Sequence, residues 1–218
     1  MRLTPVHFRG PYAITDAALL PDQGDLLLAV EEALIGGVRV VQFRDKQPPE
    51  QLTKVAAELV QLCHRFKALL LINDHLDLAL EVGADGVHLG QEDKNLEEAV
   101  RRGGPEFIVG ATCHDSLDLA LRAVAQGAQY VAFGRFFSSS TKPGASPAPL
   151  DILSAARSRI PVPLVAIGGI NLDNAAQVLS QGADMVAVVH ALFGMPRVRV
   201  QAQAFCRLIR QTQNPKTM

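Results

Sequence analysis

Four segments of this 218-residue chain share one local pattern, in which a helix-like stretch is followed by a glycine and then by a β-branched run. The four runs are "GGVRVVQF" from Gly36, "GADGVHLG" from Gly83, "GAQYVAFG" from Gly127 and "GADMVAVV" from Gly182. Glycine is the usual residue at a helix C-terminus, because it adopts left-handed conformations at little cost. Runs without apolar–polar alternation are typical of parallel strands covered on both faces. The repeat therefore predicts four helix–strand units in a buried parallel sheet.

Four further strand candidates lie between the repeated segments, at residues 12–16, 69–74, 107–113 and 164–170. Strand and helix then alternate eight times, which predicts an α/β fold, a single-domain (βα)8 TIM barrel. The chain length is close to the lower limit of about 200 residues for such barrels. An open doubly wound sheet is the alternative, but it would require a GxGxxG turn where this chain has "AITDAALL". Since no linker-like stretch divides the chain, residues 1–218 are expected to form one domain with a short N-terminal extension.

Composition excludes several classes of partner. Hydrophobic residues make up 48% of the chain and the formal charge is −1, so a large core is expected and nucleic-acid binding is not. Apolar runs such as residues 68–72 are far shorter than the roughly 20 residues that span a bilayer, so no membrane segment is predicted. Three scattered cysteines and the lack of a signal-peptide pattern indicate a cytoplasmic protein with reduced thiols. A homo-oligomer is left open.

Polar residues gather where the predicted strands end. In order along the chain they are Thr15 and Asp16; Gln42, Arg44 and Lys46; Asn73 and Asp74; Gln91, Glu92 and Asp93; Thr112 and His114; residues 135–142; Gly168 and Gly169; and His190. Any one of them alone would be more typical of a solvated loop. Because the carboxyl ends of barrel strands meet at one face, where active sites lie, their coincidence predicts a site.

The charged members of this ring separate into two roles. Arg44, Lys46 and Lys142 could clamp an anion, while Asp74 and Asp93 end the neighbouring third and fourth strands. A carboxylate pair suits magnesium, which fills its other positions with water and substrate phosphates. Zinc would require a histidine or cysteine cluster, and the sequence has none with suitable spacing.

A second anion site is suggested by "AIGGI" followed by "NLDNAAQVL". Gly168 and Gly169 allow close backbone approach, and Asn171 or Asp173 could cap the next helix. Barrels commonly bind phosphate through backbone N–H groups after strands seven and eight. A tight turn without a ligand is the alternative.

Several of these motifs together resemble the thiamine-phosphate synthase family of (βα)8 enzymes. The family's Gln-x-Arg-x-Lys appears as "QFRDK", and its Asn-Asp and Gly-Gln-Glu-Asp lie in "INDHLDLALEVGADGVHLGQED", the most specific stretch. "GATCH", "SSTK" and "AIGGINLDNAAQVLSQGADMVAVVHALF" extend the resemblance over nearly the whole chain. Thr112 stands where the family has serine, Arg135 where proline is usual, and His190 where the family has serine.

The resemblance implies a role for each matching residue. Catalytic residues would be Arg44, Lys46 and Lys142, and the magnesium ligands would be Asp74 and Asp93. Substrate-binding residues would be Gln42, Phe43, Arg44, Asp45, Lys46, Asn73, Thr112, Ser139, Ser140, Thr141, Lys142, Gly169, Val189 and His190. Of these, the serines, Thr141, Gly169, Val189 and His190 would surround a thiazole phosphate. Gln42, Arg44, Lys46, Asn73 and Lys142 would hold a pyrimidine diphosphate.

The implied reaction joins hydroxymethylpyrimidine diphosphate to hydroxyethylthiazole phosphate and releases pyrophosphate. Such a displacement needs groups that stabilise the leaving charge, which magnesium and the three cations would supply. The thiazole nitrogen is the nucleophile, so no activated serine or cysteine is needed.

Two other functions are open to such a barrel. A thiazole tautomerase-like isomerase would not require Asp93 or Lys142, and both are present. A non-catalytic phosphate-binding barrel would keep the glycines and lose the carboxylate pair. Pyrophosphate release from both substrates, with and without magnesium, discriminates among the three.

Overall fold

The computed structural model describes residue 7 and residues 10–90, 96–138 and 147–213. The strands are β1 (Tyr12–Ile14), β2 (Val40–Phe43), β3 (Leu69–Asn73), β4 (Gly86–Leu89), β5 (Ile108–His114), β6 (Tyr130–Phe133), β7 (Leu164–Ala166) and β8 (Met185–Val188). The helices are α1 (Gln23–Ile35), α2 (Pro49–Arg65), α3 (Leu76–Glu81), α4 (Leu96–Gly103), α5 (Leu117–Ala125), α6 (Asp151–Arg157), α7 (Ala175–Ser180), α8 (His190–Phe193) and α9 (Val198–Gln213).

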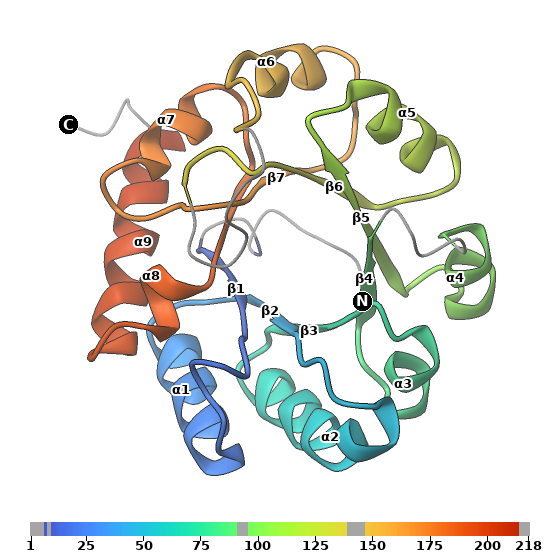
Figure 1. Ribbon diagram of the computed structural model, residues 1–218, viewed down its shortest axis with the longest axis vertical. Helices are drawn as coiled ribbons and strands as arrows, with labels where there is room; N and C mark the ends of the chain where they lie inside the picture. Colours follow the sequence, from blue (N-terminus) through green and yellow to red (C-terminus); the bar gives the residue numbers. More distant parts are fainter. Residues whose placement is uncertain (1–6, 8–9, 91–95, 139–146, 214–218) are drawn as a thin grey trace.

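The strands form a closed parallel barrel in sequence order, surrounded by the helices (Figure 1). Closure is made by β1 and β8, in which Tyr12 pairs with Ala187. The predicted α/β TIM barrel is confirmed, and the open-sheet alternative is wrong. The eighth strand is followed by the single turn α8, and the long α9 packs against α1 and α7 to complete the outer ring. None of the helices in the described residues combines the length and apolar character needed to cross a bilayer.

The repeated glycines end the helices as predicted, with one difference. Gly83, Gly127 and Gly182 have φ values of +68°, +100° and +111°, the left-handed region that stops a helix. In the first repeat Gly37 adopts this conformation, with φ +110°, and Gly36 stays right-handed. Gly36 has another role, because a Cβ there would lie 2.5 Å from Cβ of Ala202 on α9. This glycine therefore permits close contact between α1 and α9.

Alternate residues of each strand face two different apolar layers. Val87 and Leu89 of β4 lie between barrel and helices, 0% and 4% exposed, as expected for a strand of a buried parallel sheet. The barrel interior is filled by a smaller cluster that includes Tyr12 and Tyr130. Gly110 makes room for the Tyr130 ring, since a Cβ at this glycine would lie 1.9 Å from Cζ of the tyrosine.

Three of the repeated segments share a side-chain to backbone hydrogen bond at the amino-terminal end of the barrel. The residue just before β4, β6 or β8 accepts a backbone N–H from the strand before it. Asp85 accepts from Leu70 at 2.8 Å, Gln129 from Val109 at 2.6 Å and Asp184 from Leu164 at 2.7 Å. Each bond satisfies a backbone donor that would otherwise end a buried strand unpaired.

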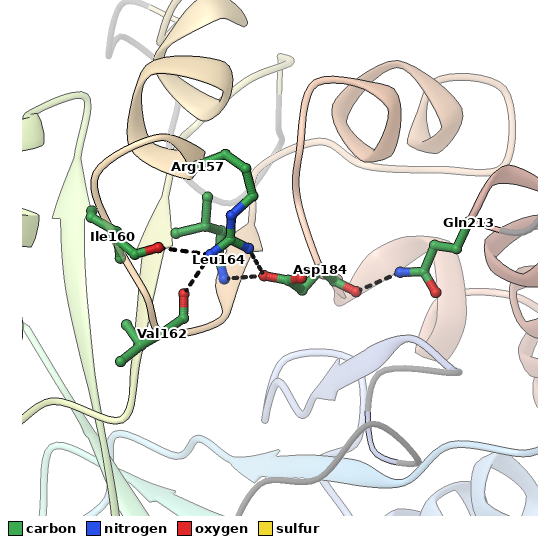
Figure 2. A network of polar contacts seen from close by, with 6 residues as sticks. All are labelled: Arg157, Ile160, Val162, Leu164, Asp184 and Gln213. Atoms are coloured by element: carbon green, nitrogen blue, oxygen red, sulfur yellow. Dashed lines mark hydrogen bonds and ion pairs between the residues drawn. The ribbon is translucent and has the colours of Figure 1, made fainter.

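The Asp184 copy is the most extensive of these contacts (Figure 2). Its carboxylate also accepts from Arg157 at 2.7 Å, and the same guanidinium donates to the carbonyls of Ile160 and Val162. Gln213 of α9 donates to the Asp184 carbonyl at 2.9 Å. The cluster thus joins α6, β7, β8 and the end of α9 on the side opposite the strand ends that carry the polar ring.

Candidate active site

A cavity of about 1000 Å³ opens at the carboxyl ends of the strands. The predicted site residues among those that line it are Gln42, Arg44, Asn73, Thr112, Gly169, Val189 and His190. They come from β2, β3, β5, β7 and the turn after β8, so the barrel brings together residues separated by almost 150 positions. The structure therefore brings these seven residues to one cavity at the strand ends. Their roles as site residues stay predictions.

Three residues of "QFRDK" do not line the cavity with their side chains. Phe43 is 2% exposed and packs in the layer between barrel and helices, so its backbone alone is available to a ligand. Asp45 accepts a hydrogen bond from the Gln47 N–H at 2.9 Å. Lys46 is exposed in the segment between β2 and α2. Substrate contact by these three residues stays a prediction.

Some predicted residues lie outside the described part of the chain. They are Gln91, Glu92 and Asp93 after β4, and Ser139, Ser140, Thr141 and Lys142 after β6. The assignments of Asp93 to magnesium and of Lys142 to catalysis therefore stay predictions.

Thr15 determines how the chain leaves β2. Its side chain is buried, and Oγ1 accepts the Arg44 N–H at 2.9 Å while the Thr15 N–H donates to the Gln42 carbonyl at 3.0 Å. The end of β1 thereby fixes the backbone on both sides of Phe43. This arrangement sets the direction in which the Arg44 guanidinium, a cation at the cavity wall, can reach.

Two non-glycine residues at strand ends have left-handed backbones. Asp74 after β3 has φ +63° and His114 at the end of β5 has φ +50°. Such conformations cost free energy and cluster at functional sites. At Asp74 the turn is held by an N–H bond to the His88 carbonyl at 2.8 Å, and its Oδ2 accepts from Asn73 Nδ2 at 2.6 Å. The strained turn thus holds an exposed carboxylate beside an amide that lines the cavity.

The metal prediction rests on Asp74 within the described residues. No group of three or more histidine, cysteine, aspartate or glutamate side chains gathers there as a metal site. A single carboxylate still fits magnesium, which takes most of its ligands from water and substrate phosphates. It does not fit a structural zinc site, which needs four protein ligands.

Gly168 and Gly169 have left-handed φ values of +101° and +65°. A Cβ at Gly168 would lie 2.2 Å from Cβ of Arg135, and one at Gly169 would lie 2.3 Å from the Ser138 carbonyl oxygen. The prediction was that these glycines let a ligand approach the backbone closely. In the structure the segment after β6 crosses the end of β7 and makes such a close approach to both glycines. Neither predicted residue is the N-cap of α7, which is Asn174 and makes no side-chain cap bond. Asn171 instead holds the turn before the helix, where its Oδ1 accepts from the N–H groups of Asp173 and Asn174 at 2.9 and 3.2 Å.

His190 is exposed at the start of α8. Its ring lies over Gly194, where a Cβ would be 2.9 Å from both Cδ2 and Nε2. Val189 turns its side chain toward the apolar interior cluster. Both residues line the cavity at this strand end.

A row of mostly buried polar side chains crosses the barrel at the floor of the cavity. Gln42 Nε2 donates to the Tyr12 hydroxyl at 2.7 Å, and the hydroxyls of Tyr12 and Tyr130 are 2.8 Å apart. The Tyr130 hydroxyl lies 2.8 Å from His88 Nδ1, and His88 Nε2 lies 2.9 Å from Thr112 Oγ1. Burial raises the pKa of both tyrosines well above the usual value, so both phenols stay protonated near neutral pH.

Sequence reasoning missed His88, Tyr12 and Tyr130 as members of the site. A signal was available: His88 is a polar residue between Val87 and Leu89, at the position that faces the barrel interior. Side chains of a strand point alternately to its two faces, so in "GVHL" the histidine faces the barrel interior when Val87 and Leu89 face the helices.

Comparison with known proteins places the chain in a family. A family model described as thiamine monophosphate synthase matches residues 11–192. The thiamine-phosphate synthase of Alcanivorax borkumensis is 52% identical over 192 residues, 87% of this chain and 88% of the relative. That of Nitrosospira multiformis is 49% identical over 206 residues, 93% of this chain and 86% of the relative.

Solved structures give the same answer. Thiamine phosphate pyrophosphorylase from Pyrococcus furiosus superposes with a TM-score of 0.85 at 35% identity, covering 96% of this chain and 99% of that chain. A 3-hexulose-6-phosphate synthase, at 16% identity and a TM-score of 0.66 over 91% of this chain and 97% of that chain, shares the fold alone. The named relatives favour the synthase over the isomerase and the non-catalytic barrel. The chain belongs to the thiamine-phosphate synthase family.

Proposed function

We propose that the cavity at the strand ends binds a pyrimidine diphosphate and a thiazole phosphate side by side and joins them. As a member of its family the chain is a transferase of thiamine biosynthesis that acts on small molecules. The observation that carries the proposal is the convergence of Gln42, Arg44, Asn73, Thr112, Gly169, Val189 and His190 on one cavity.

The diphosphate is assigned to the β2–β3 side. Arg44 there is a permanent cation on a backbone fixed by Thr15, and Asn73 adds an amide donor. Lys46, from the exposed segment after β2, and Lys142 would complete the clamp. Charge that develops on the departing pyrophosphate is stabilised by cations that are already in place, so no reorganisation is needed during bond breaking.

The thiazole phosphate is assigned to the ends of β7 and β8. Gly169 keeps this wall free of a side chain, and the turn into α8 presents the backbone at Val189 and His190. Ser139, Ser140 and Thr141 would close the site from the segment after β6. With the phosphate held there, the ring nitrogen can be oriented toward the pyrimidine carbon, which accounts for the lack of any requirement for a protein nucleophile.

Asp74 and Asp93 would hold a magnesium ion at the diphosphate. When bound, magnesium would neutralise charge on the diphosphate oxygens and so make pyrophosphate a better leaving group. The strained turn after β3 would hold the Asp74 carboxylate for this ion beside Asn73, which lines the cavity.

Pyrophosphate release with both substrates, with and without magnesium, tests the function. We expect release only when both substrates and magnesium are present. Asp74→Asn should lower kcat/KM at limiting magnesium more than at saturating magnesium, because a neutral amide binds the cation less well. Release from the pyrimidine diphosphate alone at the same rate would contradict the proposed condensation. Equal effects at both magnesium concentrations would contradict the metal assignment of Asp74.

A further inference from the structure

The five side chains that cross the barrel interior form one continuous hydrogen-bonded chain. Gln42, Tyr12, Tyr130, His88 and Thr112 come from β2, β1, β6, β4 and β5, and the four steps measure 2.7, 2.8, 2.8 and 2.9 Å. The His88 and Tyr130 rings stack with centroids 5.5 Å apart and planes 21° from parallel. The Tyr12 and Tyr130 rings meet edge to face at 5.9 Å and 76°. The geometry of the two central steps is therefore held by ring packing as well as by the hydrogen bonds.

The position of each proton determines which atom donates at every hydrogen bond of this row. Gln42 Nε2 is a donor, so the Tyr12 oxygen accepts from it. The remaining hydrogen bond that Tyr12 makes within the described residues is to Tyr130, so the Tyr12 proton goes to that oxygen. The Tyr130 proton then goes to His88 Nδ1. An imidazole whose Nδ1 accepts carries its proton on Nε2, the atom that faces Thr112.

We propose that His88 is a positioning residue, which donates from Nε2 to Thr112 Oγ1 and so fixes where this hydroxyl lies at the cavity wall. Thr112 lines the cavity, as does His88, whereas Tyr130 is not among the lining residues. The row at the floor of the cavity thus fixes the Thr112 hydroxyl, which can donate to a substrate while it accepts from His88. This inference rests on the proposed function, in which Thr112 contacts the substrate.

A fixed donor suits the step proposed for this cavity. Negative charge grows on the diphosphate as pyrophosphate departs, and a donor strengthens as its acceptor gains charge. An interaction that is stronger in the transition state than in the bound substrate changes kcat and leaves KM nearly unaltered. The histidine is therefore expected to affect turnover without touching the reacting atoms.

Two substitutions of His88 separate the role of Nε2 from that of Nδ1. An asparagine amide reaches about as far as Nδ1 and can bond to Tyr130, but not to Thr112. A glutamine amide reaches about as far as Nε2 and can donate to Thr112. We expect His88→Asn to lower kcat about fivefold with KM changed less than twofold, which corresponds to one neutral hydrogen bond of about 1 kcal/mol. We expect His88→Gln to recover most of that loss.

A double variant distinguishes positioning from a general structural role. In a Thr112→Val background there is no hydroxyl to direct, so adding His88→Asn should change kcat by less than twofold. If His88 only supports the barrel core, the two losses will multiply, and that result would overturn the proposal. Thermal unfolding of each variant shows whether the barrel remains intact during these measurements.

The position of the imidazole proton gives a readout that does not depend on activity. Nitrogen NMR of the protein labelled with ¹⁵N-histidine should show the His88 proton on Nε2 and an unprotonated, hydrogen-bonded Nδ1. Tyr130→Phe should move the Nδ1 signal and leave that of His64, a half-exposed histidine at the other end of the barrel, unchanged. A proton on Nδ1 would overturn the proposed direction.

These experiments also separate the inference from the function on which it rests. If Thr112→Val retains full activity, the substrate contact of Thr112 fails, while pyrophosphate release by the unmodified protein still reports the synthase reaction. If Thr112→Val loses activity and His88→Asn does not, the positioning role alone is wrong.

Discussion

The contact between Thr15 and Arg44 offers a direct test of how the barrel places its cation. Thr15 is 1% exposed, and its Oγ1 accepts the Arg44 N–H at 2.9 Å. Valine has nearly the same shape as threonine but cannot accept this bond, so Thr15→Val removes the acceptor without opening a cavity. Thr15→Ser is the matched control, because it keeps the oxygen and loses a methyl group.

The expected loss of stability is modest for both variants. An unpaired buried donor costs about 1–3 kcal/mol, and the lower end applies because Arg44 is only partly buried. The methyl group lost in Thr15→Ser is worth about 0.8 kcal/mol. Both changes correspond to a Tm decrease of about 2–4 °C for a protein of this size. Stability alone therefore does not separate the two variants.

Catalysis should separate them. Without the acceptor the segment after Phe43 can relax, and the Arg44 guanidinium then loses part of a charge-assisted bond worth roughly 1.5–3 kcal/mol. We expect kcat/KM for the pyrimidine diphosphate, measured by pyrophosphate release, to fall about tenfold in Thr15→Val and less than twofold in Thr15→Ser. Equal kcat/KM values in the two variants would refute the idea that this bond positions Arg44.

Three further predictions concern stability and thiol chemistry. Asp184→Ala should lower the free energy of unfolding by about 2–3 kcal/mol in urea titrations, because the buried Leu164 N–H loses its acceptor, with kcat changed less than twofold since the cluster lies opposite the cavity. Gly110→Ala should cost about 3 kcal/mol in the same assay, because the new Cβ would lie 1.9 Å from Tyr130 Cζ; an unchanged unfolding midpoint would mean that the ring can move aside. Burial raises the pKa of the Cys113 thiol to about 12, so the folded state keeps a proton that the unfolded chain releases near pH 8.5, and stability should fall as pH rises from about 8.5 to 12. Cys113→Ala should make that decrease shallower in unfolding titrations across this range, and a slope equal to that of the unmodified protein would contradict the assignment.

The order of elements was determined by the sequence alone, for a local reason. A glycine that ends a helix and a β-branched run that follows it are both short-range signals, and the chain repeats them four times. Every predicted strand is present, with ends that differ by a few residues. The ring of polar strand ends was also predictable, because the carboxyl ends of all strands in a barrel lie at one face.

Which polar groups touch was decided by the tertiary structure. Thr15 and Arg44 are 29 residues apart, and Tyr12 and Tyr130 are 118 residues apart, so no local pattern relates them. Their bonds depend on strand register and on the inward face of each strand, and both are set only when the barrel closes between β1 and β8. Gly110 shows the same dependence: the sequence presents a strand glycine, and only closure of the barrel shows that its missing side chain is the space that the Tyr130 ring fills. The sequence therefore determined the residues at the rim of the site, whereas packing inside the barrel determined the buried row that supports them.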